Sequence, residues 1–262
     1  IKFDNDGSIK VNDKEENVRY ILKNGDKVTI TLPSEKFSEH VRFIEGKLDI
    51  IYEDEYFLVV NKPANLPSIP SRNEEDASLL EIVNTYFHDN NYVTIPHIVT
   101  RLDKNTTGLV LIAKHRHIHA LFDKIDINKF YLALTKGKVA DQVIEANIKR
   151  EADSIITRCV AEDGDYAKTQ AWLEKYDEKN DVSLVKLKLF TGRTHQIRVH
   201  MSHLGHLLLG DELYGGNKDL IARQALHCHN LQFKHPITQK ELSLEALLAG
   251  DIKNITDSIG ID

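Results

Sequence analysis

Two clusters of polar residues in this 262-residue sequence have the composition of a reactive site. The first is Thr100-Arg101-Leu102-Asp103 with Thr106-Thr107-Gly108, on a predicted loop directly before a hydrophobic strand. A carboxylate on such a loop can reach a substrate while the strand behind it holds its position. Asp103 is therefore a candidate catalytic carboxylate, although an aspartate in a loop is more often a turn or capping residue.

The second cluster is Gly-Arg-Thr-His-Gln-Ile-Arg-Val-His at residues 192–200, which is predicted to open a helix directly after a strand. An arginine at a helix start can form a two-pronged pair with a carboxylate and favour the ionised form of that carboxylate. Most pairs of this kind are structural. The pattern therefore allows an arginine–aspartate site without requiring one.

Metal binding is the alternative that the histidines suggest, because histidine is the commonest metal ligand. The residues concerned are His195, His200, His203 and His206, with His227 and His229 further along. On the predicted helix, Met201 and Leu204 share a face with Ile197, whereas His203 falls largely elsewhere. No cysteine or glutamate completes a regular ligand set, so we expect no metal.

The elements that must position these clusters are predicted from apolar periodicity. Predicted strands cover residues 50–52, 56–60, 108–113, 130–134, 169–176, 182–190, 231–233 and 242–244. Predicted helices cover residues 79–87, 118–125 and 197–204, with Asp76 or Ser78 as the cap of the first and Gly205 ending the last. Strands joined by tight turns dominate, so we expect an α+β fold with a largely antiparallel mixed sheet flanked by helices.

Residues 1–44 are predicted to form a separate, small and β-rich domain, followed by a catalytic domain at residues 45–262. Ser8–Val11 leads into a polar turn at Asn12-Asp13, and residues 27–32 alternate as a half-buried strand does. The segment resembles the C-terminal half of an S4 RNA-binding domain, with a generic β-hairpin as the alternative. The two basic helices that come first in that family are absent from this sequence.

Composition argues mildly against a nucleic-acid partner, because 34 Lys and Arg stand against 40 Asp and Glu, a net charge of −6. The chain begins at Ile1 and its single methionine is Met201, so we expect a basic helical segment before Ile1. No apolar run approaches the ~18 residues that a membrane span needs. The two cysteines, Cys159 and Cys228, lie far apart, which favours a reducing cytoplasm.

Taken together, the two clusters resemble the RluA-type family of pseudouridine synthases, whose active-site loop typically reads His-Arg-Leu-Asp followed by Thr-Ser-Gly. Further segments follow in the family's order at residues 52–54, 61–63, 129–134, 210–216, 226–227 and 235–236. The likeness covers residues 48–245. Thr100 stands where the family usually has His, Thr107 where it has Ser, and Asn65 where Gly is common.

This resemblance implies a role for individual residues. Asp103 matches the invariant carboxylate, Tyr131 the tyrosine that packs on the target uracil and assists proton transfer, and Arg193 the arginine that pairs with the aspartate. Arg101 matches an arginine that helps to fill the gap left by the flipped base, and Ile197 an apolar residue of the uracil pocket. Arg198 and Lys62 are further candidates for substrate binding.

The implied reaction breaks the bond from ribose C1′ to uracil N1, rotates the base and rejoins it through C5. No redox change occurs and no external group enters, so no cofactor is expected. The expected partner is structured RNA, with ribosomal RNA of the large subunit first and transfer RNA second, and not DNA or a membrane. We expect a cytoplasmic monomer.

Two other classes are less consistent with these residues. A binding module that had lost the reaction would have little reason to keep Asp103, Tyr131 and Arg193 together. A glycosidase usually needs two placed carboxylates, and Asp103 has no evident partner in its cluster.

Overall fold

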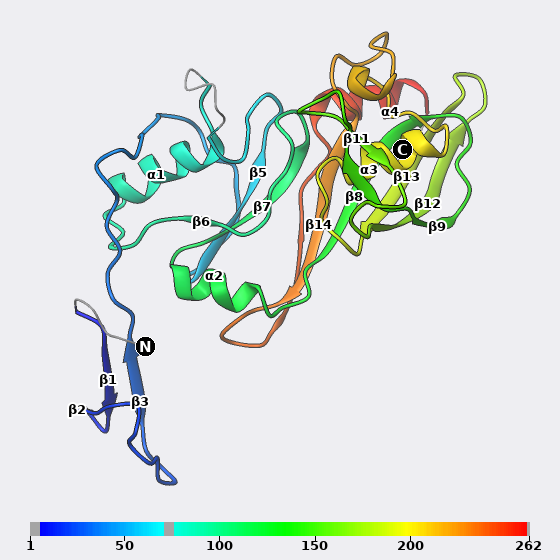
Figure 1. Cartoon of the computed structure of the whole chain (residues 1–262). Helices are drawn as coiled ribbons and strands as arrows, with labels where there is room; N and C mark the ends of the chain where they lie inside the picture. The colour runs from blue at the N-terminus through cyan, green and yellow to red at the C-terminus, as the bar shows by residue number, and fades with distance from the viewer. Residues whose placement is uncertain (1–5, 71–75, 261–262) are drawn as a thin grey trace.

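The apolar strand segments assemble into one ten-stranded sheet in the computed structural model, which describes residues 6–70 and 76–260 (Figure 1). Its strands are β4 (Ile50–Glu53), β5 (Phe57–Lys62), β6 (His97–Ile98), β7 (Thr107–Ala113), β8 (Asn128–Lys136), β9 (Gln142–Glu145), β12 (Lys168–Asp177), β13 (Val182–Leu189), β14 (Leu226–Lys234) and β15 (Glu241–Glu245). The order is β4-β5-β7-β14-β8-β13-β12-β9, with β15 on β14 and β6 on β7. Within the described residues only β7 and β14 pair in parallel, so the predicted mixed, largely antiparallel sheet is confirmed.

The parallel pair β7–β14 depends on a glycine. Gly108 lies opposite Cys228 and has a φ of +110°, and a Cβ at this position would come within 2.2 Å of the Cys228 carbonyl oxygen. Only glycine tolerates both the conformation and the close approach. Because the strands are parallel, the loops that precede them, including residues 102–106 and 223–225, lie at the same edge of the sheet.

Four α-helices are described: α1 (Leu79–Asp89), α2 (Arg116–Phe122), α3 (Gln196–His203) and α4 (Gly250–Ser258). Of the two predicted caps for the first helix, Ser78 is the one used, and it forms a capping box with Glu81. The predicted end of α3 at Gly205 agrees with a C-cap at Leu204 followed by a glycine φ of +80°. None of the described helices is long and apolar enough to span a bilayer.

The main core lies between the sheet and these helices. Buried residues of β5, β7, α1 and α2 form one cluster that includes Phe57, Leu111, Phe87 and Phe122. A second cluster, not predicted from the sequence, forms where Ile252 and Ile255 of α4 join buried residues around Leu134. The helix α4 was not predicted, although Ile252, Ile255 and Ile259 recur at helical spacing.

The N-terminal segment forms a three-stranded antiparallel sheet of β1 (Ser8–Val11), β2 (Lys14–Glu15) and β3 (Val28–Thr31), which lies apart from the large sheet in Figure 1. Asn12 and Asp13 both have positive φ values at the predicted turn. All four residues of β3 are exposed, so this sheet buries little surface. Residues 1–5 of the predicted domain lie outside the described residues, and its S4-like character and its boundary stay predictions.

Candidate active site

The loop that carries Asp103 is held by hydrogen bonds from several parts of the chain. The Ser68 hydroxyl donates to the Leu102 carbonyl oxygen and accepts from the Leu102 N–H, both at 2.9 Å. The Lys62 ammonium donates to the carbonyl oxygen of Lys104 at 3.1 Å. The backbone on both sides of Asp103 is therefore fixed by residues from β5 and the segment after it.

Lys62 is consequently not the substrate-binding residue that we predicted. Its side chain is fully buried, and its Nζ also donates to the carbonyl oxygens of Pro63 at 2.9 Å and Leu66 at 2.7 Å. Burial lowers the pKa of Lys62 to about 7, with the charge of Asp103 acting against this shift. The three N–H donors of the protonated ammonium have three carbonyl partners, so Lys62 supports the loop instead of contacting RNA.

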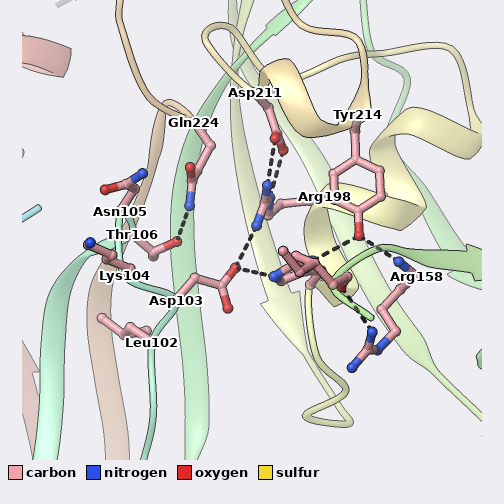
Figure 2. Close-up of polar contacts among 12 residues, drawn as sticks. Leu102, Asp103, Lys104, Asn105, Thr106, Arg158, Arg198, Asp211, Tyr214 and Gln224 are labelled. Carbon is pink, nitrogen blue, oxygen red and sulfur yellow. Dashed lines mark hydrogen bonds and ion pairs between the residues drawn. The ribbon is translucent and has the colours of Figure 1, made fainter. Parts of the chain in front are cut away.

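The segment before β14 holds the other end of the loop. Arg223 Nη1 donates to the carbonyl oxygen of Asn105 at 3.0 Å. Figure 2 shows the neighbouring bond, in which Gln224 Nε2 donates to the Thr106 hydroxyl at 3.2 Å. This contact follows from the parallel pairing of β7 with β14, which puts the two preceding loops side by side. More than 110 residues separate the two loops, so no local pattern could predict these contacts.

Asp103 pairs with Arg198, which is itself held by a buried carboxylate. Arg198 Nη1 lies 3.1 Å from Asp103 Oδ2, and Nε and Nη2 each lie 2.7 Å from an oxygen of Asp211 (Figure 2). Burial on its own would lower the pKa of Arg198, but the hydrogen bonds and charges of Asp211 and Asp103 outweigh it and raise that pKa. A permanently charged guanidinium thus fixes one oxygen of Asp103.

The prediction that Arg193 pairs with Asp103 is wrong in this structure. Arg193 Nε donates to the Tyr166 carbonyl oxygen at 3.0 Å, and its Nη1 is 3.9 Å from Asp165, on the surface. The reason is local: His195 has a left-handed backbone (φ 57°, ψ 19°) and α3 begins only at the next residue, so Arg193 lies outside the helix. Arg198 is in the first turn and points to the aspartate.

Arg198 was predicted to bind substrate, and that role stays a prediction, but its contacts give it a further one. Its side chain is 7% exposed and its Nε, Nη1 and Nη2 all donate to carboxylates, so it is a partner of Asp103. A signal for this was present in the segment Gly210-Asp211-Glu212, where a carboxylate recurs within a motif of the family. We had assigned that segment no role.

A cavity of about 440 Å³ opens beside Asp103. Its apolar wall includes Tyr131, Ile197 and Leu226, and Arg101 and Arg193 also line it. Tyr131 and Ile197 are 6% and 3% exposed, so both are fixed in the core. The structure therefore brings together every predicted site residue except Lys62.

Two basic residues that line this cavity were not predicted as site residues. Lys129 lies two residues before Tyr131 on the same strand, and burial lowers its pKa. His195 lies with its Nε2 3.7 Å from Asp103 Oδ2 and its Nδ1 2.8 Å from the Tyr214 hydroxyl. Burial also raises the pKa of Tyr131 well above its usual value, so the phenol of Tyr131 keeps its proton.

The three departures from the family's pattern have local explanations. The Thr100 hydroxyl accepts from the Leu111 N–H at 2.9 Å and is buried, so it ties the segment before Asp103 to the second half of β7. Thr107 Oγ1 lies 2.9 Å from His227 Nδ1. Asn65 has a φ of 59°, a conformation that favours glycine and that asparagine tolerates better than most residues.

Five of the six histidines that suggested a metal, all except His203, have hydrogen-bond partners within the described residues. His200 Nδ1 lies 2.9 Å from the Thr169 hydroxyl, and His206 Nδ1 lies 3.2 Å from the Lys136 carbonyl oxygen. Across residues 6–70 and 76–260, no three His, Cys, Asp or Glu side chains are grouped as metal ligands would be.

Comparison with known proteins agrees with this geometry. A family model described as RNA pseudouridylate synthase matches residues 56–203. An uncharacterised RNA pseudouridine synthase of Bacillus subtilis, YjbO, is 40% identical over 261 residues, which span 97% of this chain and 91% of the relative. The ribosomal large subunit pseudouridine synthase D of Vibrio parahaemolyticus is 34% identical over 278 residues, spanning 98% and 84%.

Solved structures agree in fold. The human RNA pseudouridylate synthase domain containing 1 protein has a TM-score of 0.61 at 24% identity and covers 82% of this chain and 96% of its own. The human domain containing 4 protein has a TM-score of 0.64 at 21% identity, covering 80% and 92%. Because the family model matches more than half of the chain and the relatives match nearly all of it, this chain belongs to the RNA pseudouridylate synthase family and is a pseudouridine synthase.

Proposed function

We propose that this chain converts specific uridines of large-subunit ribosomal RNA to pseudouridine, with Asp103 as the carboxylate that acts on the ribose. The observation that carries the assignment of Asp103 is its position at the end of a buried Asp211–Arg198 pair, beside a cavity with apolar walls. Small-molecule sites typically have volumes of roughly 300–1,000 Å³, and the cavity of about 440 Å³ lies within this range.

Asp103 has one oxygen held and one available. Oδ2 accepts from Arg198, and within the described residues no donor is bound to Oδ1. This oxygen is the one we assign to the ribose, either as the nucleophile at C1′ or as the base at C2′. The bond from C1′ to N1 breaks and the bond from C1′ to C5 forms. C5 loses a proton and N1 gains one, so the reaction balances without a cofactor.

Tyr131 and Ile197 form the site that we propose for the detached uracil. A planar base packs well between an aromatic ring and an apolar side chain. The protonated phenol of Tyr131 can assist proton transfer at the base as a donor or as a relay. A base inside a stem must leave its stack, which costs a few kcal/mol and favours targets in loops or distorted helices.

The cationic residues at the cavity are assigned to the RNA backbone. Arg101 and Arg193 are exposed and Lys129 lies deeper, so the three can contact phosphates around a flipped nucleotide. We assign Arg101 to the gap that the base leaves. The β-rich segment before residue 45 is proposed as an S4-like RNA-binding module.

The choice of RNA rests on the relatives. A Vibrio relative that matches 98% of the chain is a ribosomal large subunit pseudouridine synthase, so ribosomal RNA is our first choice and transfer RNA the second. We further propose that the protein acts as a cytoplasmic monomer on RNA and not on DNA. The two cysteines, one buried and one partly buried, are free thiols, as in a reducing compartment.

The test uses Asp103→Asn on large-subunit ribosomal RNA transcribed in vitro, with pseudouridine counted after digestion to nucleosides. The amide keeps the size of the side chain but has neither nucleophile nor base, so we expect a loss of at least ~10⁴-fold in single-turnover rate. Asp89→Asn, with a side chain 65% exposed, is the matched control and should be unchanged.

Two outcomes would contradict parts of this proposal separately. Activity of Asp103→Asn within tenfold of wild type would remove Asp103 from the reaction. Product found in transfer RNA transcripts and not in ribosomal RNA would leave Asp103 in place and overturn the choice of RNA.

A further inference from the structure

His195 occupies an unusual position between Asp103 and Tyr214. It precedes α3 in a left-handed backbone conformation, which costs roughly 1–2 kcal/mol for a residue other than glycine. Its side chain is 11% exposed. One ring nitrogen faces the hydroxyl of Tyr214 at 2.8 Å and the other faces Asp103 Oδ2 at 3.7 Å.

The contacts of Tyr214 favour one tautomer of His195, with the proton on Nε2. The Tyr214 hydroxyl oxygen already accepts from the Arg158 N–H at 3.0 Å, so its own hydrogen is available for His195 Nδ1 (Figure 2). Nδ1 is then the acceptor of a neutral imidazole, and the proton lies on Nε2, which faces a carboxylate that can only accept. This tautomer satisfies both hydrogen bonds of the Tyr214 hydroxyl and turns an N–H toward Asp103.

The surroundings of His195 favour the neutral ring. Burial lowers its pKa most, and the charges of Arg198 and Arg158 lower it further. Asp103 and Asp211 act in the opposite direction. The net direction is downward, so His195 stays neutral where the enzyme is expected to work.

We propose that His195 is a positioning residue for Asp103, whose Nε2–H becomes a second donor to Oδ2 when substrate fills the cavity. The proposal rests on the assigned role of Asp103. A separation of 3.7 Å is too long for a hydrogen bond, but such contacts commonly tighten in the substrate complex. Tyr214 holds the ring in the tautomer that donates.

A neutral donor has a specific advantage at this position. Arg198 fixes Oδ2 at one point through Nη1, while its Nε and Nη2 donate to Asp211, so the carboxylate can still turn about its own axis. A second donor stops that rotation and keeps Oδ1 aimed at the ribose. A protonated imidazole would instead add a full charge beside Asp103 and make it a poorer nucleophile or base, so activity should fall as His195 is protonated.

The test compares His195→Ala, His195→Gln and Tyr214→Phe in single turnover at saturating enzyme. His195→Ala should lower the rate about tenfold, the loss of one orienting hydrogen bond, with RNA affinity within twofold. His195→Gln, whose amide N–H can reach the place of Nε2–H, should return to within threefold of wild type. His206→Gln is the matched control, since His206 bonds a carbonyl far from the cavity.

Tyr214→Phe tests the tautomer. The ring that packs 5.0 Å from the Arg198 guanidinium is kept and only the hydroxyl is lost. Nδ1 then becomes free to take a proton, so the acidic limb of the pH–rate profile should move to higher pH, and in His195→Gln this limb should be absent. Tyr176→Phe, which loses a hydroxyl bonded to Asp181, should leave the profile unchanged.

Three results would overturn the proposal: His195→Ala within twofold of wild type, His195→Gln as slow as His195→Ala, or an unchanged acidic limb in Tyr214→Phe. Thermal unfolding of each variant identifies the assay temperature at which all are folded. If Asp103→Asn is inactive and these variants behave as wild type, only the role of His195 is wrong. If Asp103→Asn is active, the proposed function itself fails.

Discussion

Replacing Arg198 with methionine separates the two tasks of this side chain. Asp211 is 2% exposed and accepts two hydrogen bonds from Arg198 at 2.7 Å, so the variant leaves a buried carboxylate without its cation. Removing one partner of a buried pair typically costs 3–5 kcal/mol, so we expect the free energy of unfolding to fall by about this amount. For a chain of this size, roughly 2–4 °C per kcal/mol gives a Tm lower by about 6–20 °C.

The catalytic loss has a different origin. Asp103 loses a charged hydrogen bond of 3.1 Å, and bonds of this type contribute about 1.5–3 kcal/mol. If all of that is needed in the transition state, the single-turnover rate should drop about 10- to 150-fold. The rate must be measured well below the Tm of the variant, on the in vitro transcribed ribosomal RNA.

Two further variants isolate these effects. Arg193→Met removes an exposed side chain whose carboxylate contact is 3.9 Å long, so its Tm should change little. Because we assign Arg193 to the RNA backbone, RNA affinity should fall, but the single-turnover rate at saturating enzyme should stay near wild type. Arg198→Met combined with Asp211→Leu removes both buried charges and should regain most of the stability, but not the rate. A larger rate loss in Arg193→Met than in Arg198→Met, or full activity in the double variant, would refute the pairing described here.

Further predictions concern the fold, its pH dependence and RNA binding. Gly108→Ala should lower the free energy of unfolding by at least about 2 kcal/mol, because its Cβ would meet the backbone of β14. Gly250→Ala is the control and should not lower it, since nothing lies near its Cβ. Equal denaturant midpoints for the two variants would contradict this prediction. Burial lowers the pKa of His227 from 6.5 to about 4. Between about pH 6.5 and pH 4 the unfolded chain is therefore protonated at this histidine while the folded chain is not. The free energy of unfolding should fall by about 3 kcal/mol as the pH drops through this range. His227→Gln should flatten that part of the urea-unfolding profile, and an unchanged slope would be the contrary result. Lys129→Met should reduce the slope of log affinity against log salt by about 0.7–0.9, unlike the exposed Lys179→Met, and identical slopes would exclude a phosphate contact.

Much of the fold could be predicted because its strands are continuous in sequence and strongly patterned. β7 has seven buried residues in a row, and the loop before it contains the motif that includes Asp103. The short polar elements were missed, among them the hairpin of β10 (Ile148–Arg150) and β11 (Arg158–Val160). A strand of three residues with few buried positions is too short to show the alternation of apolar and polar residues by which strands are predicted.

The choice of the arginine was the main error, and its cause is physical. If residues 193–200 are all taken as helical, Arg193 lies on the helix, and both Arg193 and Arg198 are possible partners of Asp103. The left-handed turn at His195 breaks that continuity, and no local pattern announces such a turn at a histidine. Burial of Lys62 was missed for a related reason, because its partners are backbone carbonyls, which a sequence does not distinguish.

The net charge of −6 also proves a poor guide to the RNA partner, because charge acts locally on a phosphate. Asp103 and Asp211 share one arginine inside the protein and add little negative potential at the surface. Arg101 and Arg193 line the same cavity and are exposed. Carboxylates more than about 10 Å away are largely screened at physiological salt. An RNA strand bound at this cavity, as we propose, would therefore meet a positive rim around a deeper carboxylate, which is the arrangement that the proposed role of Asp103 needs.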